Sequence, residues 1–194
     1  MTKRGPRHAF QDESGATTIE FVVVFLAFIS MMMFVIELTL YQFSMASLEK
    51  AAQAGVRYAV VSAPAARNVE LENDPRGSAR AGAACSPGSG SACDRLTRRE
   101  CRGSNMGTCR AAQLDAIVRY MRQYNGAIQR RNVTVIYDDT GIGFAGGPST
   151  PMVTVSISGV QVNTGILGML LGNSANGLRT LPRRAASMTG EDLG

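Results

Sequence analysis

The 194-residue chain contains no tryptophan, one histidine and only two lysines. Its one histidine, His8, lies close to the N-terminus, which argues against a Ser-His-Asp triad and against a histidine-rich metal site. Charged residues make up only 18% of the chain, less than the quarter that is typical of globular proteins. No nucleophile is accompanied by a plausible base. We therefore expect a protein that is not an enzyme, with no catalytic residue, no cofactor and no metal.

Charge, glycine and proline are also absent from one uninterrupted run of 16 residues, Phe21 to Ile36. As a helix this run spans about 24 Å, and apolar neighbours on both sides extend it toward the roughly 30 Å of a bilayer core. Large apolar side chains fall on every side of such a helix, so no face is left for water. Because Lys3, Arg4 and Arg7 precede the run, the positive-inside rule places the N-terminus in the cytoplasm. We expect a transmembrane helix over residues 16–41.

The helical pattern continues beyond the apolar run, since after Ile36 the first glycine is Gly55 and the first proline is Pro64. Over residues 42–63 apolar residues recur every three or four positions, as expected of an amphipathic helix. The recurring residues are Leu48, Ala51, Ala52, Gly55, Val56 and Ala59. The sequence thus predicts one helix over residues 16–62, whose second half packs against a globular domain.

Glu20 places a carboxylate one turn inside the apolar helix. A charge at the bilayer centre costs about 2.5–3.5 kcal/mol on insertion scales, and such residues usually mark function. If the chain were cut between Gly15 and Ala16, the new α-ammonium of Ala16 would lie one helical turn from Glu20, at a helix N-terminus that favours negative charge. The amine could equally pair with Glu20 of a neighbouring subunit. We therefore take Gly15 and Ala16 as a candidate processing site and Glu20 with Ala16 as an assembly charge pair; an uncut signal anchor is the alternative.

The segment 15–21, GATTIEF, follows a short basic leader and precedes an apolar helix. It resembles the type III signal of type IV pilins and pseudopilins. Together with residues 48–59, LEKAAQAGVRYA, it is most similar to the TadE-like minor pilins of tight-adherence (Flp-type) pilus systems. The resemblance is close over residues 12–62 and loose over residues 130–190. Pseudopilins of type II secretion are the second choice, because they usually have Phe after the cut and Leu at the position of Thr18.

The resemblance implies that a prepilin peptidase removes the leader, residues 1–15, at the cytoplasmic side of a bacterial inner membrane. The remaining subunit would have a periplasmic domain and would serve in pilus assembly, either in the membrane machine or in the extracellular fibre. Its implied partners are other pilins or pseudopilins, bound through the N-terminal helix, the prepilin peptidase, the inner-membrane assembly platform and membrane lipid.

Residues 64–110 are rich in Gly, Ser, Ala, Pro and Arg and predict a loop. Its four cysteines, Cys85, Cys93, Cys101 and Cys109, are evenly spaced. An even number of cysteines in an exported segment indicates disulfides. Three pairings are open, and we lean to Cys85 with Cys93 and Cys101 with Cys109. A zinc site is the alternative, although the spacing does not match that of zinc knuckles.

The remainder predicts a small α+β domain over residues 111–188, with a flexible tail at 189–194. Apolar residues from Leu114 recur with helical spacing as far as Ile128. Alternating patterns around residues 133–137 and 153–157 predict two strands, most simply antiparallel, on either side of a Gly-rich turn. Residues 165–171 form an apolar loop or short helix, and residues 178–188 return as an edge strand, the only place in a sheet that Pro182 permits apart from a bulge. The expected fold class is α+β: a long N-terminal helix, a disulfide-stapled loop, a second helix and a small antiparallel sheet.

Residues 94–131 hold nine arginines against three acidic residues, a local excess of six positive charges. Guanidinium groups bind phosphates by bidentate hydrogen bonds. We take Arg95, Arg98, Arg99 and Arg102 as candidate anion-binding residues. The alternative function is therefore a single-pass, membrane-anchored module that binds DNA or anionic glycan. A solvated arginine-rich face is the simpler interpretation, and nucleic acid is disfavoured because few aromatic residues are interleaved.

Overall fold

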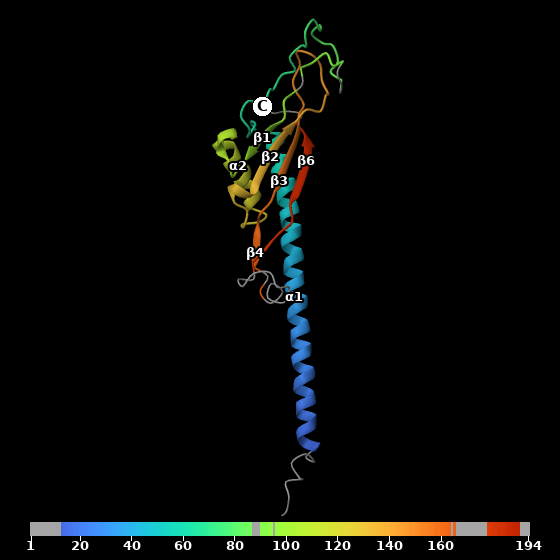
Figure 1. Cartoon of the computed structure of the whole chain (residues 1–194), viewed down its shortest axis with the longest axis vertical. Helices are drawn as coiled ribbons and strands as arrows, with labels where there is room; N and C mark the ends of the chain where they lie inside the picture. The colour runs from blue at the N-terminus through green and yellow to red at the C-terminus, as the bar shows by residue number, and fades with distance from the viewer. Residues whose placement is uncertain (1–12, 87–89, 95, 164, 166–177, 191–194) are drawn as a thin grey trace, which may run out of the picture.

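The computed structural model describes residues 13–86, 90–94, 96–163, 165 and 178–190. The first element, α1 (Glu13–Val60), is a single helix of 48 residues. Its upper half packs against a globular domain, while its lower half extends away from that domain (Figure 1). The helix ends four residues before Pro64, within two residues of the predicted end. The long N-terminal helix expected from the sequence is confirmed.

The domain contains a four-stranded antiparallel sheet in the order β1-β2-β3-β6. Its strands are β1 (Arg99–Arg102), β2 (Val133–Asp138), β3 (Met152–Ile157) and β6 (Arg184–Thr189). A separate two-stranded hairpin consists of β4 (Gln161–Asn163) and β5 (Leu178–Thr180). The helical elements after α1 are the short η1 (Met106–Thr108), α2 (Ala111–Arg122) and the short η2 (Arg130–Asn132). The α+β fold class is therefore confirmed.

The core lies between one face of the sheet and the two helices. Alternate residues of β2 and β3 face it and are fully buried, beginning with Val133 and Val153. From α1 the core receives mostly small side chains, and from α2 the apolar stripe predicted by the sequence. The helix residues are Leu48, Ala51, Ala52, Val56 and Ala59 from α1, and Leu114, Ile117, Val118 and Met121 from α2. The alanines allow α1 to approach the sheet closely, which fixes the stalk to the domain.

Gly55 of α1 lies directly against Met121 of α2. A Cβ placed on Gly55 would lie 2.8 Å from Sδ of Met121, so the absence of a side chain makes room for the methionine. Beside this contact the rings of Tyr58 and Tyr120 stack with centroids 5.4 Å apart. The glycine in the amphipathic pattern therefore has a packing role.

Several boundaries differ from those expected. The predicted loop over residues 64–110 contains β1, which joins the sheet at its edge beside β2. The second helix ends at Arg122, yet Ile128 is still buried in the core. The single returning strand expected over residues 178–188 is two strands, interrupted around Pro182, because β5 pairs with β4 while β6 pairs with β3.

Two further expectations fall largely outside the described residues. Of the apolar stretch 165–171 the structure describes only Gly165, and of the tail only Thr189 and Gly190. Thr189 is the last residue of β6, and the backbone N–H of Gly190 donates to the carbonyl of Pro151 at 2.7 Å. The described start of the predicted flexible tail is therefore part of the sheet and its cap.

The structure joins Cys85 to Cys93 and Cys101 to Cys109, with Cα–Cα distances of 5.3 and 4.8 Å. Cys101 lies in β1 and Cys109 directly after η1, and both are fully buried in the core. The second disulfide therefore connects the edge of the sheet to the segment that leads into α2.

Candidate functional site

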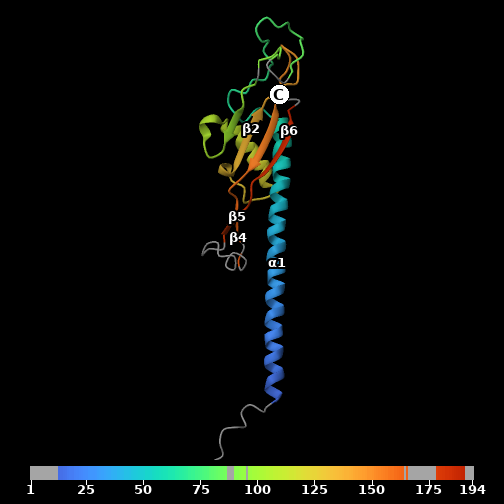
Figure 2. The same ribbon diagram turned by 45° about the vertical axis from the view of Figure 1, so that its right-hand side comes forward.

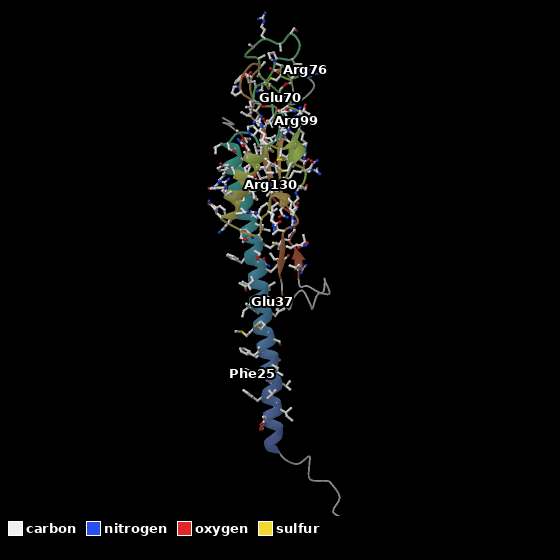
Figure 3. All side chains as sticks on the ribbon, turned by 90° about the vertical axis from the view of Figure 1, so that its left-hand side faces the viewer. Phe25, Glu37, Glu70, Arg76, Arg99 and Arg130 are labelled. Atoms are coloured by element: carbon white, nitrogen blue, oxygen red, sulfur yellow. A yellow bond between two sulfur atoms is a disulfide. The ribbon has the colours of Figure 1, made fainter. Side chains whose placement is uncertain are left out.

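The lower part of α1 presents an apolar surface that the described part of the domain leaves uncovered over residues 17–36. We call residues Glu13–Phe43 of α1 the stalk. Phe21 is 67% exposed and Phe43 is 72% exposed, whereas Leu48, little more than one turn beyond, is 1% exposed. The most apolar 18-residue window of the helix has a mean hydropathy of 2.7, and none of it is buried. Figure 3 shows the labelled Phe25 projecting from this bare part of the helix.

Three hydroxyl groups in and just beyond the stalk are satisfied within the helix. The hydroxyl groups of Ser30, Thr39 and Ser44 donate to backbone carbonyls three or four residues earlier, at 2.8–2.9 Å. Such bonds remove the need for water around a hydroxyl group, so these residues are compatible with a lipid or protein environment. By length and composition the helix fits a membrane anchor.

Glu20 lies on the exposed stalk. Because α1 begins at Glu13, the backbone runs as one helix through Gly15 and Ala16 to Glu20. Ala16 and Glu20 are four residues apart, which is about one turn, or 6 Å along the axis. An amine created at Ala16 would therefore lie within reach of the Glu20 carboxylate, as the charge-pair hypothesis requires.

A second candidate site is an open cavity of about 450 Å³ at the end of the sheet remote from the stalk. We call it the arginine cavity. Arg67, Arg98 and Arg99 line it together with Glu100. Figure 3 shows Arg99 near the far end of the domain, close to Glu70 and well away from Glu37 on the helix.

The arginines of this cavity lie near acidic side chains or backbone carbonyls. Arg98 lies 3.6 Å from Asp138, and Arg99 lies 3.9 Å from Glu70. The Nε of Arg67 donates to the carbonyl of Cys109 at 3.0 Å. The Nε of Arg99, in contrast, is buried without a hydrogen-bond partner among the described residues. Three arginines and one glutamate thus line the cavity, and the ion pairs of Arg98 and Arg99 are long, so the lining keeps positive charge that favours an anion.

Arg102 does not line the arginine cavity. It forms a bidentate pair with Glu100, at 2.7 and 3.0 Å. The hydrogen bond from Arg102 is the main reason that the pKa of Glu100 lies below its ordinary value, against the opposing effect of burial. Of the four predicted arginines, the structure brings together Arg98 and Arg99, and Arg95 lies outside the described residues.

Sequence reasoning missed Arg67 as a member of this cavity. The chain around Ala66 forms an antiparallel bridge with Cys109, and the N–H of Arg67 donates to the carbonyl of Thr108 at 3.0 Å. These backbone contacts carry Arg67 to the free edge of β1. No local sequence pattern predicts these contacts, since the segment around Ala66 and the segment around Cys109 are far apart in the chain.

The zinc alternative for the cysteines is not supported. All four cysteines are paired in disulfides, so no thiolate remains for a metal. Within the part of the chain that the structure describes, no group of three or more His, Cys, Asp or Glu side chains could hold an ion.

Residues 15–57 match the family model described as TadE-like protein. This N-terminal segment is TadE-like. The match contains the Gly15–Ala16 bond, Glu20 and the stalk, and it ends just before the end of α1. No curated protein and no solved structure matches the chain. The resemblance to the TadE-like family is thus confirmed for residues 15–57.

Proposed function

We propose that this protein is a minor pilin or pseudopilin, a membrane-anchored structural subunit used in assembling a tight-adherence (Flp-type) pilus. The observation that carries the proposal is that the TadE-like segment, residues 15–57, contains nearly all of the exposed apolar stalk. A surface of this kind must be covered by lipid or by other protein. A pilin helix meets both in turn, lipid before assembly and neighbouring helices after it.

The proposed topology follows from charge. The basic residues before the apolar run keep the N-terminus in the cytoplasm, so the domain at the other end of α1 lies in the periplasm. Removal of residues 1–15 by a prepilin peptidase takes this basic leader away and leaves an amine at Ala16. That amine neutralises a Glu20 carboxylate, on the same helix or on the next, and so sets the register in which stalks pack.

The first experiment determines the N-terminus of the protein extracted from membranes of cells that carry the pilus system. Intact-mass spectrometry should show a chain that begins at Ala16. Expression in cells without the peptidase is the control and should give the uncut chain. A chain that retains its leader in the presence of the peptidase would contradict the proposed processing.

A second experiment tests the charge pair with Glu20→Gln, which keeps the size of the side chain and removes its charge. We expect cleavage and membrane insertion to persist, while the amount of the subunit recovered with sheared pili or with the assembly platform falls about tenfold, the effect of about 1.4 kcal/mol. Glu49→Gln is the matched control, since Glu49 is an exposed carboxylate on the part of α1 beside the domain. Equal recovery of both variants would refute the pairing role of Glu20.

The arginine cavity supports a second candidate, a membrane-anchored module that binds an anionic glycan or nucleic acid. It rests on the buried Nε of Arg99, which lacks a partner among the described residues, beside Arg67 and Arg98. Binding of heparin, as a model polyanion, should weaken steeply with salt and be lost in Arg98→Gln/Arg99→Gln but not in Arg57→Gln/Arg119→Gln. Equal binding by both double variants would eliminate this candidate.

A further inference from the structure

The hairpin of β4 and β5 extends from the sheet toward the stalk. In Figures 1 and 2 it lies below the main sheet and beside α1, on the side toward the bare part of the helix. Gly165, which lies between β4 and β5 in the chain, is in contact with Glu37 of α1: a Cβ on this glycine would be 2.6 Å from the glutamate Oε1. The hairpin thus places residues of the C-terminal part of the chain at the upper end of the apolar run.

Two arginines from this region lie over consecutive turns of α1. The guanidinium of Arg179, in β5, lies 5.5 Å from the ring centroid of Tyr41. The Nη2 of Arg184, the first residue of β6, lies 3.8 Å from Sδ of Met45. Tyr41 and Met45 are one helical turn apart, so the two positive charges are stacked along one side of the helix, about 6 Å apart in height.

Neither arginine has a carboxylate partner among the described residues, where four ion pairs are formed by other arginines. The Nε–H of Arg184 is buried and donates to no acceptor within that part of the chain. Arg179 is exposed, and its contact with Tyr41 satisfies the charge only weakly. A guanidinium held against apolar side chains without a counter-charge is costly, so an anion supplied from outside would stabilise this arrangement.

The height of the two arginines identifies the source of that anion. The uncharged run ends at Ile36. Tyr41 is therefore about 7.5 Å, and Met45 about 13.5 Å, farther along the helix axis. The headgroup region of a bilayer extends about 5–8 Å beyond each side of the hydrocarbon core. If α1 spans a membrane with its apolar run in the core, Arg179 lies at the level of the headgroup phosphates, and Arg184 lies about 6 Å farther out, just beyond the headgroup region.

We propose that Arg179 binds the phosphate of an anionic phospholipid headgroup, in the leaflet that faces the domain, while Arg184 adds positive charge just above the headgroups, and that the two arginines thereby set the height of the domain above the membrane. The inference rests on the proposed function only in that α1 spans a bilayer. Tyr41 contributes to the site because its ring lies at the membrane surface, where tyrosine is favoured, and holds the Arg179 guanidinium in place. Fixing the height of the domain keeps the stalk at one depth in the bilayer.

The test uses the full chain in an uncharged detergent, titrated with phosphatidylglycerol or with phosphatidylcholine, with retained lipids counted by native mass spectrometry. Each arginine near an anionic surface contributes about fivefold to affinity, so both together contribute about 30-fold. We expect phosphatidylglycerol to bind more tightly than phosphatidylcholine, and Arg179→Gln/Arg184→Gln to weaken its binding about 30-fold. The matched control, Arg57→Gln/Arg119→Gln, removes two exposed arginines on α1 and α2 away from the site and should bind as the unaltered protein does.

Several results would overturn the inference. The first is equal binding of the two lipids by the unaltered protein, a measurement that does not depend on any variant. The second is an equal loss of binding in the control. The single variant Arg179→Gln, at an exposed position, should fold normally and lose about fivefold, and no loss would also count against the site. If the arginine variants reduced recovery with other pilus subunits without changing lipid binding, the two residues would belong to a protein interface instead.

Reconstitution into phosphatidylcholine vesicles separates this inference from the proposed function. A chain that resists extraction by alkaline carbonate is inserted through α1. Failure to insert would contradict the membrane subunit itself, whereas insertion without selectivity for phosphatidylglycerol would contradict only the headgroup site.

Discussion

Tyr137 makes a single hydrogen bond that connects the sheet to the end of the long helix. Its side chain is fully buried in β2, and its phenolic oxygen accepts a hydrogen bond of 2.9 Å from the backbone N–H of Ala65, just after α1. Replacing Tyr137 with Phe keeps the ring and removes the acceptor. The N–H of Ala65, which is also buried, is then left unpaired. An unpaired buried donor costs about 1–3 kcal/mol, so we expect Tyr137→Phe to lower the free energy of unfolding by about 2 kcal/mol.

The measurement is urea unfolding of the full chain in an uncharged detergent, followed by near-ultraviolet circular dichroism of the tyrosines, which reports tertiary packing. A loss of about 2 kcal/mol corresponds to a decrease of about 4–8 °C in the melting temperature of a domain of this size. Tyr124→Phe is the control, because Tyr124 is 45% exposed and its hydroxyl group bonds to nothing in the described part of the chain. We expect it to change stability by less than about 0.5 kcal/mol.

The same tyrosine predicts a dependence on pH. Burial raises the pKa of Tyr137 above its ordinary value, and the hydrogen bond from Ala65 opposes this only in part. Above about pH 10 the tyrosine ionises in the unfolded state while it stays neutral in the folded state. This ionisation stabilises the unfolded state, so the free energy of unfolding falls as the pH rises. Phenylalanine cannot ionise. The stability difference between the native protein and Tyr137→Phe should therefore narrow above about pH 10.

Two results would refute this reasoning. If Tyr137→Phe were as stable as Tyr124→Phe at neutral pH, the Ala65 N–H would have found another acceptor. If the difference between the native protein and Tyr137→Phe stayed constant from neutral pH to about pH 11, the buried hydroxyl group would not be the ionising group.

The two disulfides close loops of the same length, a sequence separation of 8 in each case, so loop entropy predicts about 2.6 kcal/mol for both. Urea unfolding should show that Cys101→Ser/Cys109→Ser lowers the free energy of unfolding more than Cys85→Ser/Cys93→Ser does, because the first pair buries two hydroxyl groups in the core. Equal losses in the two variants would argue against this burial effect. Gly103→Ala should cost more than about 2 kcal/mol, because its Cβ would overlap the backbone carbonyl of Arg130, while Gly126→Ala, with open space around it, should be nearly neutral. Similar melting temperatures for the two glycine variants would show that the backbone at Arg130 yields easily.

The N-terminal half of the fold was predictable because its signals are local. An uncharged run followed by apolar residues at helical spacing depends only on neighbouring positions, and α1 follows it to within three residues at each end. The strands around residues 133–137 and 153–157 were equally visible in their alternation. The antiparallel pairing of two such strands that follow each other in the chain is also the simplest arrangement that the chain allows.

The parts that were missed depend on contacts between distant segments. β1 carries the sequence RECR, which has no strand-like apolar alternation; it becomes a strand because β2 offers it an edge and the Cys101–Cys109 disulfide holds it in place. In the same way, α2 ends before Ile128, although Ile128 fits the spacing of the helix and is buried. A periodic pattern records that a residue is buried, and burial can be achieved by a loop as well as by a helix.

The sequence alone determined that this chain has an apolar stalk with a carboxylate near its start and a TadE-like signal, because these properties belong to consecutive residues. Only the tertiary structure decided which arginines act together. It separated Arg102 from Arg98 and Arg99, added Arg67 to them, and placed Arg179 and Arg184 at the opposite end of the domain, against Tyr41 and Met45. Charges that are adjacent in the chain can point to opposite faces of a strand, while sheet register and a descending hairpin bring together charges that lie far apart in the chain.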